Sequence, residues 1–390
     1  MADNSMPKMP RTPGGAPMGV PKQPNTPKSG ESFMERLKSD KKTQGIVAAV
    51  VLLLVVIVVV AVVVVKKGEN ASDLSNTLFG SNSQSQDLNS YSRLNGELTT
   101  EEGEDAWVTA LMIENLASDS VRPQPGLGDA GIVYETLAEG GITRFVAMFS
   151  GEIEAEKIGP IRSSRDYYLE FVSEYDALYG HMGGSPQALE AISGLGIKDL
   201  DGMYVGSQYY ERDRSIAAPH NLFTSGEKVQ FALRDRDLDK LPAVYEPWNF
   251  QDSAAPNDRG EGAGVTIDFS TAAYSVDWEY DAPSNEYLRK NGGEVHRDGN
   301  TNEQLSAMNV AIQIVPPVKV LDAKGRLQMD LTGSGQAYVL QNGEMISGTW
   351  EKTSRTERTR FMDESGEEVS FVRGTTWVEV VPSDRDVTFN

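Results

Sequence analysis

Three consecutive segments decide the fold of the N-terminal half: ITRFVAMFS (142–150), RDYYLEFVSEY (165–175) and DALYGHM (176–182). The first and third are short, largely apolar runs bounded by turn residues, which is typical of strands. The second has helical spacing, and Ser163 and Asp166 at its start have the spacing of a capping box. The order of strand, helix and strand predicts a layered α/β unit.

This pattern extends to both sides of the unit. AWVTALMIEN (106–115) predicts a further buried strand, and PQALEAIS (186–193) predicts a helix with Pro186 at its first position. GLGDAGIVYETLAEGG (126–141) predicts another helix, with Asp129 as N-cap and two glycines as its end. We therefore expect an α/β domain over residues 105–248.

The composition changes after this domain. Residues 249–261 are rich in turn formers and predict a linker, whereas residues 262–383 contain short runs separated by Gly, Asn and Asp that predict strands. The expected fold class is α+β: a single transmembrane helix, then an α/β N-terminal domain packed with a mostly antiparallel, β-rich C-terminal domain.

Residues 46–65, IVAAVVLLLVVIVVVAVVVV, are twenty apolar residues without a charge, which is long enough for a transmembrane helix. Four basic residues lie just before this run and two just after it, so the positive-inside rule predicts a cytoplasmic N-terminus and extracytoplasmic C-terminal domains. Residues 1–45 predict a disordered cytoplasmic segment, and residues 66–104 a flexible polar stalk. The expected location is the cell membrane, with a single pass.

Composition excludes several classes of function. The formal net charge is −21, which argues against nucleic-acid binding. The absence of cysteine excludes disulfides, thiolate metal sites, cysteine nucleophiles and a lipid-modified N-terminal cysteine. The three histidines lack the close spacing of a zinc motif, and we expect no metal and no cofactor.

The stretch KIGPIRSSRDYY (157–168) places Arg162 and Arg165 three residues apart in an acidic chain. On the predicted helix, Glu135 and Glu139 share one face and repel each other, which indicates a nearby cation; Arg144 is a further candidate. Two interpretations stay open. The cluster is either a set of buried ion pairs that fixes the fold, or a pocket in which a guanidinium binds a carboxylate or phosphate.

The turn HMGGSP (181–186) joins a predicted strand to a helix N-terminus, an arrangement that suits anions. It does not match the nucleophile pattern G-x-S-x-G, because Gln187 occupies the position of the last glycine. The alternative interpretation, a plain turn with Ser185 as helix N-cap, stays open. One or two histidines could line a polar cleft. The candidate ligand-binding residues are Arg122, Glu135, Glu139, Arg144, Arg162, Ser163, Arg165, His181, Gly183, Gly184, Ser185, Arg212, His220, Arg289 and His296.

Several long motifs occur in an order that resembles the YerB-like family of bacterial, exported, membrane-associated proteins. They are RPQPGLGDAGIVYETLAEGGITRF (122–145), EKIGPIRSSRDYY (156–168), YDALYGHMGGSP (175–186), APHN (218–221), YLRKNGGEVHRD (287–298), MNVAIQ (308–313), GSGQAYVLQNGEMISGTWEK (333–352) and GTTWVEVV (374–381). The resemblance implies two associated domains, an α/β one and a β-rich one. It supplies no reaction and no catalytic residues. Many relatives carry a lipobox cysteine, which this chain lacks.

The sequence thus predicts a membrane-anchored, extracytoplasmic binding or scaffolding module, with an Arg/Glu/His cleft for an anionic cell-wall ligand or an envelope protein. The alternative is an enzyme acting on cell-envelope polymer, with Glu135 or Glu139 as acid/base, His181 as proton carrier and Arg162 and Arg165 as an anion clamp. A third interpretation is a purely structural cluster. The sequence contains no recognised catalytic motif, and it leaves the oligomeric state open.

Overall fold

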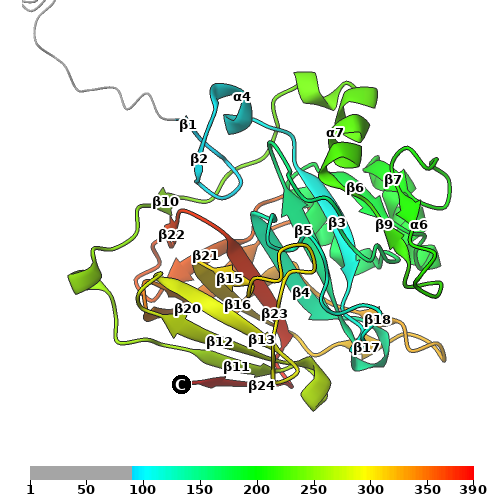
Figure 1. Cartoon of the computed structure of the whole chain (residues 1–390). Coiled ribbons are helices and arrows are strands. Elements are labelled where there is room, and N and C mark those ends of the chain that lie inside the picture. The colour runs from blue at the N-terminus through cyan, green and yellow to red at the C-terminus, as the bar shows by residue number, and fades with distance from the viewer. Residues whose placement is uncertain (1–89) are drawn as a thin grey trace, which may run out of the picture. The chain divides into compact units, whose positions relative to one another are not determined.

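A ten-stranded mixed sheet runs through residues 90–390, the part of the chain that the computed structural model describes (Figure 1). It is built from both halves of the sequence. Its strands, in spatial order, are β21 (Arg360–Asp363), β20 (Glu344–Lys352), β19 (Gly333–Gln341), β16 (Asn309–Val315), β23 (Thr376–Pro382), β4 (Ile132–Leu137), β5 (Thr143–Phe149), β3 (Thr109–Glu114), β6 (Leu178–His181) and β7 (Lys198–Asp201).

The two halves of the sequence meet inside this sheet, at the pair β23 and β4. The pair is parallel and places Glu379 beside Glu135, and β16 is also parallel to β23. Every residue of β23 and β4 is buried. Most strand pairs of the β-rich region are antiparallel, as the sequence predicts, and its last long strand, β23, is an exception because it pairs in parallel on both sides.

A second sheet contacts the first through inward-facing side chains. It consists of β14 (Glu294–Val295), β13 (Glu286–Asn291), β12 (Ser275–Asp281), β11 (Val265–Asp268) and β24 (Asp386–Phe389), with β15 (Ser306–Ala307) beside β13. Four two-stranded pairs complete the strands: β1 (Ser90–Tyr91) with β2 (Leu98–Thr99), β8 (Glu211–Arg212) with β9 (Leu222–Phe223), β10 (Phe250–Gln251) with β22 (Phe371–Val372), and β17 (Lys319–Val320) with β18 (Leu327–Gln328).

The helices of the described residues are short. They are α4 (Glu101–Glu104), α5 (Leu169–Glu174), α6 (Pro186–Leu195) and α7 (Gly226–Asp235), with 3-10 turns at Glu139–Gly141, Asp166–Tyr168, Leu238–Lys240, Pro256–Asp258 and Ala272–Tyr274. In α6, the Ser185 hydroxyl accepts the N–H of Ala188, Pro186 opens the helix, and Gly196 ends it at a φ of 67°. The predicted helix at 186–193 is confirmed, and so are the strands predicted at 106–115, 142–150 and 176–182.

The helix predicted within residues 126–141 is wrong, because residues 132–137 form strand β4. Ile132, Val133 and Tyr134 favour a strand, and a strand between two neighbours buries both faces, which removes the alternation by which strands are recognised. Glu135 and Glu139 therefore do not share a helix face. Glu135 points into the interior, and Glu139 lies in the 3-10 turn that follows the strand.

The capping box expected at Ser163 and Asp166 is also absent. Arg165 precedes the 3-10 turn that leads into α5, and no side chain caps that turn. The Ser163 hydroxyl instead donates to the carbonyl of Met182 at 2.8 Å.

The expected stalk ends earlier than predicted, because residues 90–104 form β1, β2 and α4, and Leu94 is buried. The predicted cytoplasmic segment (1–45), the membrane span (46–65) and the start of the stalk lie outside the described residues. Among residues 90–390, no helix is both long and apolar enough to cross a bilayer.

Because β4 and β23 pair inside one sheet, we expect that fragments 90–251 and 262–390, expressed separately, will not fold alone. Each would expose a long apolar sheet edge. Circular dichroism melting and gel filtration of each fragment and of their mixture would check this, with a cooperative transition expected only for the mixture. A fragment that is monomeric and melts cooperatively by itself would contradict the expectation.

Candidate functional site

The two turns singled out in the sequence contact each other. The amide of Ser164 donates to the Gly183 carbonyl at 2.9 Å, and the amide of Ser185 donates to the Ser164 carbonyl at 3.2 Å. Gly184 forms a bridge with Ser164. The turn after Pro160 is thus fixed against the turn that starts α6, and the candidates Arg165 and Ser185 are brought to the same place.

Arg165, Glu139 and Arg144 form an ion cluster beside these turns. The Arg165 guanidinium binds the Glu139 carboxylate through two nitrogens, Nε to Oε1 and Nη2 to Oε2, the latter at 2.8 Å. Arg144 Nη2 lies 3.8 Å from Glu139 Oε2, and its Nη1 donates to the Ser163 carbonyl. Burial acts to raise the pKa of Glu139, but the hydrogen bond and charge of Arg165 outweigh it and the pKa is lowered. Glu139 is therefore an ionised partner shared by two cations.

A second cluster joins Arg162, Glu114 and His220. Arg162 Nε lies 3.3 Å from Glu114 Oε1, and His220 Nδ1 lies 2.9 Å from Glu114 Oε2. Burial is the main cause that lowers the pKa of Arg162, and the charges of Arg144 and Arg165 act in the same direction. Glu114, the last residue of β3, was not among the candidates from the sequence. A carboxylate at the end of an apolar strand could have indicated it as a candidate.

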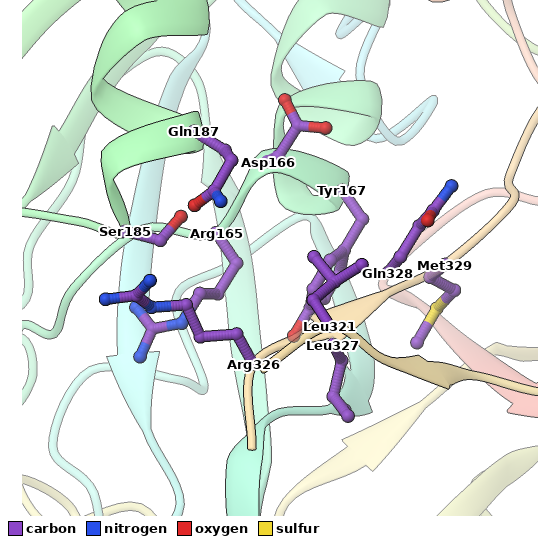
Figure 2. A pocket seen from close by; sticks show the side chains of 10 residues that line it. All are labelled: Arg165, Asp166, Tyr167, Ser185, Gln187, Leu321, Arg326, Leu327, Gln328 and Met329. Carbon is purple, nitrogen blue, oxygen red and sulfur yellow. The ribbon is translucent and has the colours of Figure 1, made fainter. Parts of the chain in front are cut away.

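Arg165 and Ser185 line a pocket of about 240 Å³ between the N-terminal half and the β17–β18 hairpin (Figure 2). The other lining residues divide between these two parts of the chain: Asp166, Tyr167 and Gln187 from the first, and Leu321, Arg326, Leu327, Gln328 and Met329 from the second. In Figure 2 the guanidinium groups of Arg165 and Arg326 extend to the same side. Sequence reasoning missed the hairpin residues, because nothing in the sequence indicates that this hairpin lies beside α6.

The two arginines differ in how many donors remain available. Arg165 uses four of its N–H groups on Glu139 and on the carbonyls of Ser163 and Ser164. Arg326 donates one hydrogen bond, from Nη1 to Asp322 Oδ2 at 2.9 Å, and its other guanidinium N–H groups have no acceptor among the described residues. Arg326 is therefore the main available donor of the pocket.

The loop of the hairpin holds Arg326 in place. Asp322 Oδ1 accepts the amides of Lys324 and Arg326, and the Leu321 amide donates to the Arg326 carbonyl at 2.7 Å. Burial acts to raise the pKa of Asp322, but these amide hydrogen bonds and the charge of Arg326 lower it.

His181 and Gly183 are held by aspartates from the neighbouring strand. His181 is buried; its Nδ1 lies 2.8 Å from the Gly183 carbonyl and its Nε2 lies 2.9 Å from Asp199 Oδ1. Asp201 Oδ1 accepts the amide of Gly183 at 2.7 Å. These contacts shape the Gly-Gly-Ser turn, while the imidazole itself lies beneath the surface.

Arg212 lies apart from this site. It is exposed on β8, where it donates to Asn221 Oδ1 at 2.8 Å. It does not line the pocket beside α6.

Four other candidates lie in a polar cluster inside the protein. Arg289, on β13 of the second sheet, is fully buried; its Nη2 binds Glu135 Oε2, and its Nη1 lies 3.5 Å from Glu379 Oε1. The guanidinium also lies over the ring of Trp377, 4.4 Å from its centroid. Trp278 Nε1 donates to Glu379 Oε1 at 2.8 Å.

The two carboxyl groups of this cluster are opposite one another on β4 and β23. Burial raises the pKa of Glu379 to about 8, and the neighbouring Glu135 adds to the effect. At neutral pH, Glu379 is therefore mostly protonated, and one guanidinium faces one carboxylate and one carboxylic acid. The cluster is close to neutral, which is what burial requires.

His296 and Arg122 extend this cluster through amide side chains. Burial lowers the pKa of His296 well below its ordinary value, and the charges of Arg289 and Arg122 lower it further. The neutral ring accepts from Arg289 Nε at 3.0 Å, and its Nε2 donates to Gln124 Oε1 at 2.9 Å. Arg122 donates to Asn115 Oδ1. We assign Arg122, Glu135, Arg289 and His296 to the fold rather than to ligand contact.

The three histidines therefore have separate partners: Asp199, Glu114 and Arg289. Among the residues that the structure describes, no group of three or more His, Asp or Glu side chains could hold a metal ion.

Comparison with known proteins identifies both halves of the chain. Residues 94–239 match the N-terminal domain, and residues 265–378 the C-terminal domain, of the protein family of unknown function DUF3048. The protein named "Putative lipoprotein YerB" from Bacillus subtilis (strain 168) is 31% identical over 277 residues, which cover 70% of this chain and 80% of the relative. The chain therefore belongs to the DUF3048 family. The crystal structure of YerB protein from Bacillus subtilis matches with a TM-score of 0.67 at 27% identity, covering 76% of this chain and 99% of that one.

In this DUF3048 protein, we expect the protonation of Glu379 to make the stability depend on pH. The pKa of Glu379 in the folded protein is about 8, above its ordinary value of 4.5, so the folded state holds a proton that the unfolded state releases between these values. The free energy of unfolding should fall as pH rises from 4.5 to 8, by at most about 1.4 kcal/mol per pH unit from this group.

Glu379→Gln should remove this contribution, because a glutamine resembles the protonated acid and its oxygen can still accept from Trp278. Urea unfolding at pH 5, 6, 7 and 8 would show the wild type losing stability relative to the variant as pH rises. Glu135→Gln is the contrasting change: it removes a charge that helps to raise the pKa of Glu379, so Glu379 should ionise beside Arg289 at lower pH and the pH dependence of stability should weaken. Parallel curves for the wild type and Glu379→Gln would contradict the assignment.

Arg165→Gln should lower the free energy of unfolding by about 1–3 kcal/mol, because it leaves the half-buried Glu139 carboxylate with only Arg144 at 3.8 Å. Changing Glu139 to Gln in the same chain should recover part of the loss, since no orphaned charge remains. Denaturant unfolding of the two single variants and the double variant would measure this coupling. Strictly additive losses would show that the two groups do not stabilise each other.

Proposed function

We propose that this chain is an extracytoplasmic, membrane-associated binding protein that holds an anionic component of the cell envelope in the pocket lined by Arg165 and Arg326. The proposed location is supported by the Bacillus subtilis relative, which is named "Putative lipoprotein YerB". The sequence contains no cysteine, and we propose residues 46–65 as the membrane attachment.

The observation that carries the proposal is that several guanidinium N–H groups of Arg326 have no acceptor among the described residues. In a chain with a formal net charge of −21, an arginine that faces a pocket with several free N–H donors is a specific feature. Guanidinium N–H groups bind carboxylate and phosphate oxygens in bidentate fashion. Arg165 adds positive charge to the same wall of the pocket.

The geometry favours binding over acid/base catalysis at this site. Glu135 is sealed in the interior, and the paired Glu139 has a lowered pKa, which makes it a poor proton donor at neutral pH. His181 is fully buried beneath the Gly-Gly-Ser turn. None of the three groups assigned to catalysis in the enzyme hypothesis is placed to exchange a proton with a ligand in the pocket.

Arg326→Gln should abolish retention of the purified full-length protein on cell-wall sacculi without changing its melting temperature measurably. Its single ion pair with Asp322 lies within one partly exposed loop, and such pairs contribute about 0–1 kcal/mol. A co-sedimentation assay measures the retention.

Lys319→Gln is the matched control, because Lys319 lies in the same hairpin, pairs with Asp330 at 3.1 Å, and does not line the pocket. It removes the same charge and should leave retention unchanged. Equal retention of wild type and Arg326→Gln would overturn the proposal, and equal losses in both variants would reduce it to a general charge effect.

A further inference from the structure

Resting on this proposed function, we infer that the ligand of the pocket is a carboxylate attached to a short apolar group, as at the C-terminal end of a peptide. The inference uses three features of the pocket: its separate polar and apolar walls, its limited unpaired charge, and its size.

One wall of the pocket consists of hydrogen-bond donors. Arg326 has free N–H groups on Nε and Nη2, and Arg165 has one remaining. Gln187 lies in the first turn of α6, where its amide N–H has no intrahelical acceptor, whereas the amide of Ala188 is capped by Ser185. The Ser185 hydroxyl lines the same pocket, and its hydrogen is available to a ligand. These donors match the two oxygens of a carboxylate.

The other wall is apolar. Leu321, Leu327 and Met329 come from the β17–β18 hairpin, and Figure 2 shows them on the side away from the two guanidinium groups. Leu321 is 48% exposed, so about half of this apolar side chain remains in contact with water. A ligand with an apolar group next to its charge would cover this side chain, whereas an inorganic anion would leave it in water.

The charge of the pocket suits a single negative charge. Arg165 is already paired with Glu139, and Arg326 with Asp322. Asp166 also lines the pocket and adds a negative charge of its own. A dianionic phosphate would meet more repulsion here than a carboxylate would, because the cations of the site are largely balanced.

The volume restricts the ligand to a small group. About 240 Å³ is below the 300–1,000 Å³ typical of sites that enclose a drug-sized molecule. The pocket can therefore enclose the terminal residue of a longer chain, while the rest of that chain lies outside.

Isothermal titration calorimetry of the full-length protein in detergent tests the inference with three probes: N-acetyl-alanyl-leucine, the same dipeptide as its C-terminal amide, and inorganic phosphate. We expect the acid to bind, the amide to bind at least tenfold more weakly because it lacks the carboxylate, and phosphate to bind more weakly than the acid.

Two variants connect binding to the pocket. Arg326→Gln should weaken binding of the acid at least tenfold, while Lys319→Gln should not change it. Leu321→Asn should weaken the acid about threefold or more and leave phosphate unaffected, because Leu321 contacts only the apolar part of the ligand. Leu321 is partly exposed, so this variant should fold normally.

The outcomes separate this inference from the proposed function. If phosphate binds in an Arg326-dependent way and the dipeptide acid does not, the ligand class is wrong while the anion pocket stands. If no probe binds but sacculi retention still requires Arg326, the ligand class is again wrong. If no probe binds and retention does not depend on Arg326, both the proposed function and the inferred ligand class are overturned. If the acid and its amide bind with equal affinity, the inference that the ligand is a carboxylate is rejected.

Discussion

The buried contact of Arg289 with Glu135 and Glu379 constrains the rest of the structure. The three side chains come from β13 of the second sheet and from β4 and β23 of the first. Removing such charges from water costs several kcal/mol for each ion, and only good geometry among all partners offsets that cost. The contact therefore fixes the register of β4 against β23 and the position of the second sheet at once. A shift of either strand by one residue would turn its glutamate to the opposite face of the sheet.

This constraint also positions the candidate site. Strand β4 leads directly into the 3-10 turn that carries Glu139, and β5 returns with Arg144 near its start. The ion cluster around Glu139 is thus attached to the same strand as the buried one, a few residues further along. Both clusters pair arginine with glutamate, but they differ in exposure: Glu135 is fully buried, whereas Glu139 is partly exposed and binds Arg165, which lines the pocket.

Sequence patterns predicted those parts of this architecture that depend on local chemistry. Ser185 and Pro186 define the start of α6, and the apolar runs define β3, β5 and β6. Strand β4 was predicted as a helix, and β13 was not predicted. Buried positions of β4 include Glu135, and those of β13 include Arg289 and Asn291, so the apolar pattern of a strand is hidden in both. The pairing of Arg162 and Arg165 with carboxylates was foreseen as one interpretation. Glu114, Glu379 and Arg326 were missed because their roles depend on contacts between distant segments, which local spacing does not encode.

The places where the two halves of the chain meet differ in how their charges are used. At Glu174, both Lys352 Nζ and Arg358 Nη1 bind the carboxylate at 2.8 Å, and Arg358 is buried against Trp248 and two tyrosines. Arg289 is likewise paired within the protein, with Glu135 and Glu379. At the pocket beside α6, by contrast, Arg326 is paired only within its own loop, and its free donors face Ser185 and Gln187 from the other half. Since the neighbouring junctions are closed by ion pairs, a ligand carboxylate in this pocket would complete a third junction of the same chemical type.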